Sequence, residues 1–483
     1  MKIKYQTIIA SAFRVYGLVA FFCMALAFVS CNEDILIDKV DEDAYSNIQT
    51  LIGTLRDAST GKTSNIVELF QDSYCSSVSF NLSRIPKSGV DIKVEYDASY
   101  ADVYNIEHGT DFKVWPQDRF SIDNDGKIVV APDEKQSYSL GIEITRSETP
   151  ELEAETTYIL PLKATVSGGD VKLSEEESHC VYLIKNRSGE GSAMRYPGEK
   201  ETFLYFEVND TNPLNALQFR MEDGRYLWNY VVLFAANINY NRETGELYVY
   251  KNPQVQYILD HNEEIIQPLR KRGIKVLLGL LGNHDESGLA QLSELGARDF
   301  AGKLAAICNA YNLDGVNFDD EYSNSPDFNN PLFTTPSSDA GSRLMYETKK
   351  AMPDKYVTTF QYSYMRGTDY VDGVEAGMWL DIAVANYGSS ARPLKGMTNA
   401  NCSYNSVEMM RSGYISEANA RSCRESDYGY YMVFALWATG RQGDRNHFGA
   451  VDNLARGLYG SSLVKPQYYW PSPISLETKP ISW

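Results

Sequence analysis

The sequence predicts a multidomain chain in which an N-terminal antiparallel β-sandwich is followed by an α/β TIM (β/α)8 barrel. Three observations support this prediction. Apolar and polar side chains alternate in short runs over residues 48–185, which is typical of half-buried strands. Over residues 201–470, apolar runs alternate with helical stretches instead, which favours βα units around a parallel sheet. The 483 residues are 43% apolar and 12% aromatic, enough for more than one hydrophobic core.

The N-terminus has the pattern of a secretory signal. Basic residues precede a largely apolar run over residues 15–30, and small residues lead to Cys31. The run is shorter than the roughly 20 residues that a transmembrane helix needs, and acidic residues follow Cys31 at once. The pattern resembles a bacterial lipoprotein signal, with Cys31 as the lipidated first residue of the mature chain. We therefore expect residues 1–30 to be a signal peptide and the polar residues 31–47 to be a tether.

Residues 48–185 are expected to form the β-sandwich. Turns rich in Gly, Pro, Asp and Ser separate the expected strands, at residues 78–82, 90–96, 127–130, 138–144, 158–164 and 181–184. The segment resembles the N-terminal domain of Bacteroidetes surface lipoproteins, and the acidic residues after Cys31 resemble their surface-export signal. This resemblance implies an outer-membrane lipoprotein at the cell surface. Because the segment shows no acid pair and no metal cluster, a spacer is favoured over an accessory carbohydrate-binding module.

The barrel is expected over residues 201–470. A polar, glycine-containing linker, residues 186–200, precedes it, and a C-terminal tail, residues 471–483, follows it. Eight strands in roughly 270 residues match a TIM barrel. These strands are expected near residues 202–208, 229–236, 274–281, 313–319, 356–362, 380–386, 401–406 and 429–436. Helices are expected over residues 254–271, 297–311, 340–351, 417–425 and 450–459.

Charge is concentrated in the stretch 313–322, where an apolar strand core ends in Asp319, Asp320 and Glu321. If the strand reaches residue 321, Asn317, Asp319 and Glu321 share one face, with the two carboxyls roughly 6 to 7 Å apart. One charge then opposes the ionisation of the other, so we expect Glu321 to stay protonated while Asp319 carries the charge. In a barrel, such strand ends form the active site. A cluster of solvated acids is the alternative.

The same stretch resembles the D-G-x-D-x-D-x-E signature of glycoside hydrolase family 18. The resemblance extends over about residues 200–466 to bacterial endo-β-N-acetylglucosaminidases of the Endo H type, through residues 203–209, 234–240, 273–278, 281–284 and 458–461. It implies that Glu321 is the general acid, that Asp319 orients the substrate's acetamido group and that Tyr387 contacts this group. The implied reaction cleaves the β-1,4 bond between the two N-acetylglucosamines of an N-glycan core. It is retaining, proceeds through an oxazolinium ion, and needs no metal or cofactor.

Further residues at the expected strand ends are candidates for substrate binding. Trp437 follows the eighth strand and can stack on a sugar, although a core tryptophan is the alternative. Gln361 can bind an acetamido or hydroxyl group, or only bond to a loop. The other candidates are the amides Asn283, Asn317 and Asn386.

Two positions depart from the family pattern. Asn317 replaces the first Asp of the D-x-D-x-E triplet, and Ala385 stands where related endoglycosidases often carry Asn or Gln. Asn317 cannot share a proton with Asp319, but its NH₂ group can donate to that carboxylate and hold it ionised. We therefore expect an altered rate and pH optimum, with the acid Glu321 retained.

The formal charge of −19 argues against a nucleic-acid partner and favours neutral partners such as sugars. The cysteines after Cys31 have no C-x-x-C spacing, so neither a disulfide framework nor a zinc site is expected, although Cys402 and Cys423 can pair. The expected partners are N-linked glycans or glycoproteins, the membrane that holds the lipid anchor, and other outer-membrane proteins of glycan utilisation.

Two other functions remain as rivals. One is a surface glycan-binding protein built on an inactive barrel. The retention of Asp319 and Glu321 argues against it, because a groove that only binds gains nothing from a raised-pKa acid. The other is a chitinase. Chitinases usually carry Asp after the strand-six tyrosine, whereas Gly388 follows Tyr387 here.

Overall fold

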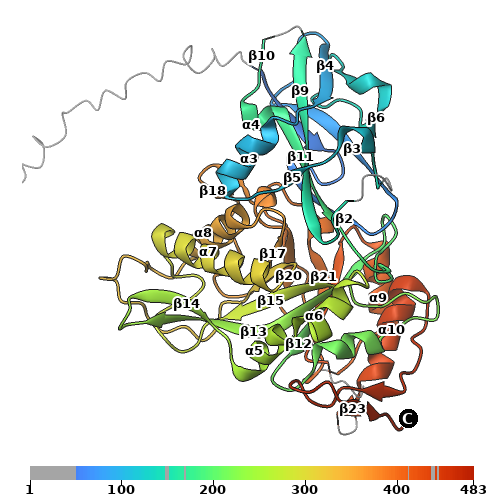
Figure 1. The fold of residues 1–483 in the computed structure, drawn as a ribbon, viewed down its shortest axis with the longest axis vertical. Helices are drawn as coiled ribbons and strands as arrows, with labels where there is room; N and C mark the ends of the chain where they lie inside the picture. Colours follow the sequence, from blue (N-terminus) through green and yellow to red (C-terminus); the bar gives the residue numbers. More distant parts are fainter. Residues whose placement is uncertain (1–50, 147–151, 168–169, 412, 437–440, 443–444) are drawn as a thin grey trace, which may run out of the picture. The chain divides into compact units, whose positions relative to one another are not determined.

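The computed structural model describes residues 51–483 except residues 147–151, 168–169, 412, 437–440 and 443–444 (Figure 1). The expected signal peptide, the lipidation site Cys31 and the tether lie outside the described residues, and so does Trp437. The chain divides into two compact units. The smaller unit includes β10 (Val171–Lys172), and the larger unit, residues 52–169 and 173–483, contains nearly everything described below.

Two β-sheets make up the N-terminal region. The first sheet is antiparallel in the order β1-β3-β8-β6, with β1 (Leu51–Asp57), β3 (Ser73–Leu82), β8 (Leu140–Thr145) and β6 (Phe120–Ile122). The second has the order β2-β11-β9-β4-β7, with β5 beside β9; its strands are β2 (Ser64–Leu69), β11 (His179–Asn186), β9 (Thr156–Ser167), β4 (Val90–Tyr96), β7 (Lys127–Val130) and β5 (Lys113–Val114). The connections contain α3 (Tyr100–His108), η1 (Gln117–Arg119), η2 (Asp123–Gly126) and α4 (Glu175–Ser178).

The second sheet is mixed. β2 runs parallel to β11, and β5 runs parallel to β9, so the expectation of purely antiparallel pairing is wrong for this sheet. Alternation along a strand reports which face is buried but not the direction of a partner that comes a hundred residues later. Five of the six expected strands fall within observed strands, and the sixth, 138–144, overlaps β8. The region is therefore an N-terminal sheet domain, and its arrangement as a sandwich stays a prediction.

Eight parallel strands form a nearly closed barrel in the order β20-β17-β16-β15-β13-β12-β22-β21. Each expected barrel strand overlaps an observed one: β12 (Glu201–Glu207), β13 (Tyr230–Asn241), β15 (Lys275–Leu281), β16 (Gly315–Phe318), β17 (Tyr356–Gln361), β20 (Ile382–Ala385), β21 (Ser403–Glu408) and β22 (Tyr430–Phe434). β12 pairs with both β13 and β22. The ladder pairing between β20 and β21 is an isolated bridge of Ala383 with Cys402, which leaves a weak seam. Ser403 Oγ and the Ser406 oxygen also accept hydrogen bonds across it, from the Ala385 and Gly388 N–H groups.

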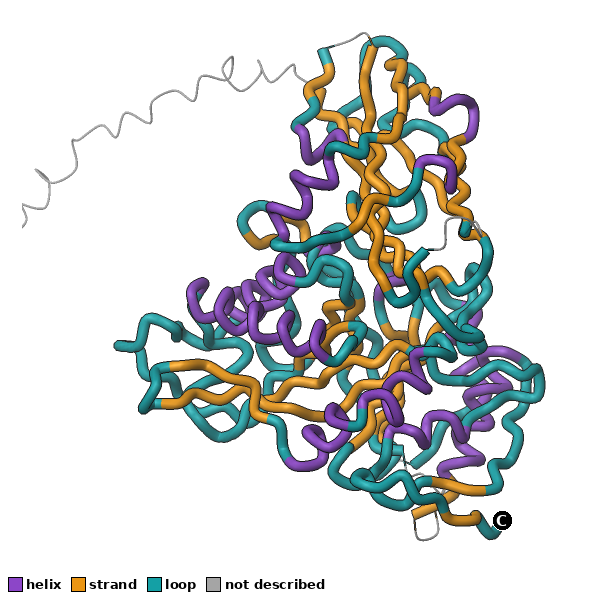
Figure 2. The backbone as a smooth tube through the Cα atoms, viewed as in Figure 1, coloured by secondary structure: helices purple, strands orange, loops and turns teal. Residues whose placement is uncertain are grey.

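Helices follow some of the barrel strands, as Figure 2 shows in purple. They are α5 (Pro253–Asp260), α6 (Asn262–Arg270), α7 (Glu294–Ala310), α8 (Ser338–Ala351), α9 (Glu417–Glu425) and α10 (His447–Tyr459). The helix expected over residues 254–271 is two helices that meet at His261. The connections after β12, β17 and β20 carry short elements instead: η3 (Pro213–Gln218), β18 (Tyr370–Val371), β19 (Val374–Glu375), η4 (Ala376–Met378) and η5 (Asn399–Asn401).

Capping residues start several helices. The side chains of Ser293 and Ser337 accept hydrogen bonds from backbone N–H groups in the first turns of α7 and α8. Asn252 does the same for α5, where Pro253 occupies the first turn. Beyond β13, the strand β14 (Glu246–Tyr250) returns as a hairpin, and β23 (Arg441–Gln442) pairs with β24 (Arg445–Asn446) before α10.

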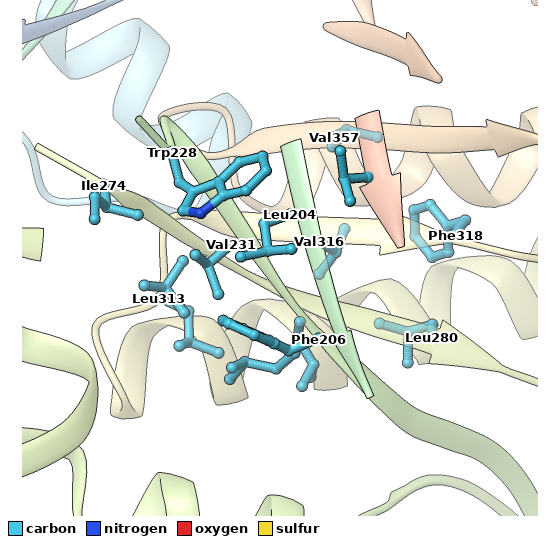
Figure 3. Close-up of a cluster of buried hydrophobic side chains, with 14 of the residues drawn as sticks. Leu204, Phe206, Trp228, Val231, Ile274, Leu280, Leu313, Val316, Phe318 and Val357 are labelled. Carbon is cyan, nitrogen blue, oxygen red and sulfur yellow. The ribbon is translucent and has the colours of Figure 1, made fainter. Parts of the chain in front are cut away.

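The barrel strands bury both of their faces. Figure 3 shows part of the outer layer, in which Leu204, Phe206, Val316 and Phe318 are fully buried in the large hydrophobic cluster. The alternate residues of β12, such as Phe203, belong to a separate cluster inside the barrel. Because side chains alternate along a strand, residue 317 faces the inner side of β16, and residue 319, just beyond the end of the strand, continues that alternation.

Two segments expected as a flexible linker and a tail are packed. Within residues 186–200, Arg187 and Ala193 are buried, and Gly189 lies so close to the backbone of Lys271 that a Cβ there would stand 2.2 Å from the Lys271 oxygen. Within residues 471–483, β26 (Lys479–Pro480) pairs with β25 (Tyr468–Tyr469). A polar composition predicts exposure but does not report such backbone contacts.

Candidate active site

The carboxylate cluster lies where β16 ends. The strand stops at Phe318 rather than reaching residue 321, and the Asp319 N–H donates to the Leu280 oxygen (3.1 Å) just beyond it. Asp319 is buried and Glu321 is half-buried. The acids therefore stand at the carboxyl ends of the parallel strands, where barrel enzymes hold their catalytic groups.

Backbone contacts with the loop after β15 fix the position of Glu321. The Gly282 N–H donates to the Glu321 oxygen (3.0 Å), and the His284 N–H donates to the Tyr322 oxygen (2.6 Å). A Cβ at Gly282 would stand 2.4 Å from the Glu321 oxygen, so only glycine permits this approach. Tyr322 itself has a φ of 61°, in the left-handed region. The general-acid candidate is thus held by its main chain.

The pKa values of both acids are raised. Burial raises the pKa of Asp319 well above its usual value, and the negative charge of Glu321 adds to this effect. Burial also raises the pKa of Glu321, although the charge of Arg411 opposes that rise. Because Asp319 is the more deeply buried acid, burial opposes its ionisation more than that of Glu321. The expectation that Asp319 carries the charge stays a prediction.

Asn317 was expected to donate to Asp319 and hold it ionised, but the structure gives its amide another partner. Its Nδ2 donates to Thr358 Oγ1 (2.8 Å) on β17, the residue directly opposite in the strand register. The Thr358 hydroxyl in turn donates to the Val316 oxygen (2.9 Å). Asn317 also faces the buried Tyr205, with which its side chain shares a hydrogen bond. Asp319 Oδ1 has no hydrogen-bond partner among the described residues, so it leaves a buried acceptor free for a ligand in the barrel mouth.

Tyr387 lies beside the two acids. Its ring centroid is 5.5 Å from that of Phe360 and 6.0 Å from that of Phe434. Burial raises the pKa of the phenol, and the charges of Asp319, Glu408 and Glu321 raise it further. The hydroxyl group therefore stays protonated and can donate a hydrogen bond. The structure thus brings Asp319, Glu321 and Tyr387 together, as the sequence indicates.

The remaining candidates have partners within the protein. Gln361 Nε2 donates to the Arg392 oxygen (2.9 Å) and Gln361 Oε1 accepts from the Arg392 N–H (2.8 Å), which favours the loop-bonding role. Asn283 Nδ2 donates to Asn239 Oδ1 (2.9 Å). Asn386 Oδ1 accepts from the N–H of the next residue (2.7 Å). The binding roles of these three residues stay predictions, as does that of Trp437.

The fold and the sequence match proteins of known activity. Two crystal structures of EndoBT-3987 from Bacteroides thetaiotamicron each cover 89% of this chain and 99% of their own. The structure with a Man5GlcNAc product has a TM-score of 0.82 at 44% identity, and that in complex with a Man9GlcNAc2Asn substrate has 0.75 at 42%. Endo-β-N-acetylglucosaminidase F1 from Elizabethkingia meningoseptica is 42% identical over 269 residues, 54% of this chain and 79% of that protein. This chain belongs to the endo-β-N-acetylglucosaminidases.

An endo-β-N-acetylglucosaminidase is a glycoside hydrolase, so the acids at the end of β16 belong to an enzyme. The similarity to EndoBT-3987 extends over the N-terminal sheets as well as the barrel, given its coverage. A family model for an N-terminal domain also matches residues 45–171. The two-part organisation is therefore shared with a solved endo-β-N-acetylglucosaminidase.

Three residues near the site of this endo-β-N-acetylglucosaminidase were not predicted. Tyr205 is buried on the inner side of β12, and burial with the charge of Asp319 raises its pKa well above the usual value. Glu408 ends β21 and pairs with Arg411 (Nε to Oε2, 3.0 Å). The alternation of side chains along residues 203–209 could have indicated that Tyr205 faces the barrel interior. The sequence marks β21 only weakly, so nothing in it indicated Glu408.

The described residues contain no cluster of three or more His, Cys, Asp or Glu side chains that could hold a metal ion. Cys402 and Cys423 are buried free thiols. No helix within the described ranges has the length and apolar character needed to cross a membrane.

Proposed function

We propose that this enzyme hydrolyses the β-1,4 bond of the N,N'-diacetylchitobiose core of N-glycans by substrate assistance. The observation that carries the proposal is the convergence of Asp319 and Glu321, which follow β16, with Tyr387, which follows β20, at the same end of the barrel. Support comes from EndoBT-3987, whose structures contain a Man5GlcNAc product and a Man9GlcNAc2Asn substrate. High-mannose N-glycans are therefore the proposed substrates.

Glu321 acts as the general acid. Burial raises its pKa, which favours the protonated form that a general acid needs, and its half-buried position lets the carboxyl reach a substrate at the barrel mouth. It protonates the oxygen that leaves with the N-acetylglucosamine attached to the protein. After that sugar has left, the Glu321 carboxylate takes a proton from water, which attacks the anomeric carbon of the retained sugar as the bond from that carbon to the substrate's acetamido oxygen breaks.

The substrate's own acetamido group serves as the nucleophile. Its carbonyl oxygen bonds to the anomeric carbon as the glycosidic bond breaks, and this step gives an oxazolinium ion, so the anomeric configuration is retained. Asp319 accepts a hydrogen bond from the acetamido N–H and stabilises the positive charge. For this it must be ionised, which the positive charge that develops on the acetamido group favours although Asp319 is buried. The Tyr387 hydroxyl donates to the acetamido carbonyl and orients it.

Mass spectrometry of a digested glycopeptide tests the function. Incubation of a peptide carrying one high-mannose N-glycan should give the peptide with a single N-acetylglucosamine and a free glycan with one N-acetylglucosamine at its reducing end. Release of the intact glycan, trimming from the outer end, or no reaction would contradict the proposal. Chitin oligosaccharides incubated in parallel should remain uncut, and their cleavage would favour the chitinase alternative.

We also propose that the protein is a cell-surface lipoprotein anchored through Cys31. The support is the N-terminal sequence, with its basic residues, apolar run and acidic residues after the cysteine. A surface location would place the enzyme beside other outer-membrane proteins of glycan utilisation. In cells fed a labelled fatty acid, the wild-type protein should become labelled and Cys31→Ser should not. Protease added to intact cells should degrade the wild-type protein, which tests the surface location. Label on Cys31→Ser would contradict the anchor.

A further inference from the structure

A series of aromatic rings leads away from the acids along the barrel mouth. The ring of Tyr387 lies 5.5 Å from that of Phe360 on β17, and the Phe360 ring lies 6.2 Å from that of Tyr362. Phe360 is buried, whereas the rings at the two ends of the series, Tyr362 just beyond its strand and Tyr387, are 36% and 38% exposed. Tyr362 therefore ends a series whose other end, Tyr387, lies beside Asp319 and Glu321.

The turn that carries Tyr362 is held rigidly. Ser363 has a φ of 47°, and the Met365 N–H donates to the Tyr362 oxygen (2.9 Å). Met365 is fully buried, and its oxygen accepts from Thr359 Oγ1 (2.9 Å). Gln361, the residue before Tyr362, is bonded through both ends of its amide to the backbone of Arg392. The ring is thus presented on a fixed backbone, so binding to it costs little conformational entropy.

Asp320 connects this turn to the segment 319–321, which carries the two acids. Its carboxyl group faces the Ser363 hydroxyl and the backbone N–H groups of Tyr364 and Ala290, and these hydrogen bonds oppose the rise in its pKa that burial causes. Asp320 stands between the two acids in the chain. The position of Tyr362 is therefore coupled through one residue to that of Asp319 and Glu321.

We propose that Tyr362 is a specificity-determining residue that stacks against a mannose on the glycan side of the cleaved bond. The inference rests on the proposed function. A rigid ring on the surface offers an apolar face to the C–H groups of a pyranose. The mannose part is the constant part of the substrate, whereas the peptide sequence varies, so a preorganised ring has a fixed partner only on the glycan side. The ring of Phe360 separates Tyr362 from Tyr387, a placement that suits a sugar beyond the one that reacts.

Binding to an inactive enzyme tests the proposal without turnover. In the Glu321→Gln background, a high-mannose oligosaccharide with one N-acetylglucosamine is titrated calorimetrically against Tyr362→Ala and Tyr362→Phe. We expect Tyr362→Ala to weaken binding roughly tenfold and Tyr362→Phe, which keeps the ring, to bind within about twofold of the parent. The matched control is Tyr370→Ala, because Tyr370 is also exposed in the same connection but lies in β18, which contacts the outer helix α8.

The same titration with a mannose-free N,N'-diacetylchitobiosyl peptide locates the contact. Tyr362→Ala should leave its affinity unchanged. Equal weakening of both ligands would place Tyr362 at the cleaved pair or at the peptide and overturn the proposal, and so would unchanged affinity for the oligosaccharide. In active enzyme, Tyr362→Ala should raise KM roughly tenfold on the high-mannose glycopeptide with kcat within about twofold. If the wild type releases no glycan, the proposed function fails, while the titrations still decide the role of Tyr362.

Discussion

At the scale of single residues, the catalytic proton can be tested directly. Glu321→Gln keeps the shape of the side chain but cannot deliver a proton, so glycan release should fall about 10²- to 10⁴-fold. Affinity for the high-mannose oligosaccharide should stay within about threefold, because binding does not require the acid. Single-turnover mass spectrometry and calorimetry measure the two quantities. Turnover near the wild-type rate would show that another group protonates the leaving oxygen.

Arg411 gives the site a predictable pH response. Its positive charge lowers the pKa of Glu321, so Arg411→Met should raise that pKa. The acid then keeps its proton to higher pH, and the alkaline limb of the kcat/KM profile should move upward. The side chain of Arg411 is 85% exposed, so screening should limit the movement to less than about one pH unit.

The control for this profile is Arg421→Met on α9, which removes a similarly exposed, paired arginine away from the site. Its pH profile should coincide with that of the wild type. High salt should move the wild-type profile in the same direction as Arg411→Met, and less in the variant. A movement towards acid pH in Arg411→Met would contradict the assigned coupling.

At the scale of elements, the loops after β15 and β16 act as one unit. Gly282→Ala places a Cβ 2.4 Å from the Glu321 oxygen, so the catalytic loop must shift. A displacement of about 1 Å can cost roughly 10²-fold, and we expect kcat to fall by that order. Gly302→Ala is the matched control, since Gly302 lies in α7 with open space at its Cβ position. It should keep full activity and raise Tm slightly. Equal activity of the two variants would show that the contact is not needed.

Much of the barrel could be predicted because its strands are buried on both faces and stand out as apolar runs. The site could be predicted in part, since Asp319 and Glu321 follow the strongest of these runs. Two things could not. The end of β16 at Phe318 depends on where neighbouring strands stop pairing. The partner of Asn317 depends on the strand register, which sets Thr358 opposite it.

At the scale of the whole molecule, buried ion pairs join the N-terminal domain to the barrel. Lys62 Nζ contacts Asp381 Oδ1 (2.7 Å), and Lys349 Nζ contacts Asp381 Oδ2 (3.0 Å). Arg187 likewise pairs with Asp314, which also bonds to Arg270. Lys62 and Arg187 belong to the chain before β12. Their partners Asp381 and Asp314 stand directly before β20 and β16. The N-terminal domain is therefore expected to unfold together with the barrel, which favours a structural role over that of a mobile binding module.

Acid unfolding tests whether these ion pairs couple the two domains. Burial would raise the pKa of Asp381, but Lys349 and Lys62 outweigh it and lower the pKa to about 2. A carboxyl whose pKa is depressed on folding contributes stability above its unfolded pKa, and this contribution, about 2 kcal/mol here, disappears as pH falls from about 4 to 2. Lys62→Met should weaken it and move the acid-unfolding midpoint to higher pH, as followed by circular dichroism.

The comparison for Lys62→Met is Lys113→Met, which breaks an exposed pair with Glu153 in the same domain. That variant should unfold at the wild-type pH, because exposed pairs contribute little. An unchanged midpoint for Lys62→Met, or separate transitions for the two domains, would show that the ion pair of Lys62 with Asp381 does not couple the two domains.

The weak seam between β20 and β21 divides the mouth of the barrel unequally. β16, which the acids follow, is hydrogen-bonded to strands on both sides. Tyr387 follows β20 and Glu408 ends β21, and these two strands share a single bridge. Backbone amides along the seam should exchange with deuterated water sooner than those of β16. On warming, Tyr387, which orients the acetamido group, should therefore lose its position before Glu321, the proton donor, does. As temperature rises, the substrate concentration needed for half-saturation should climb while the maximal rate still follows ordinary activation.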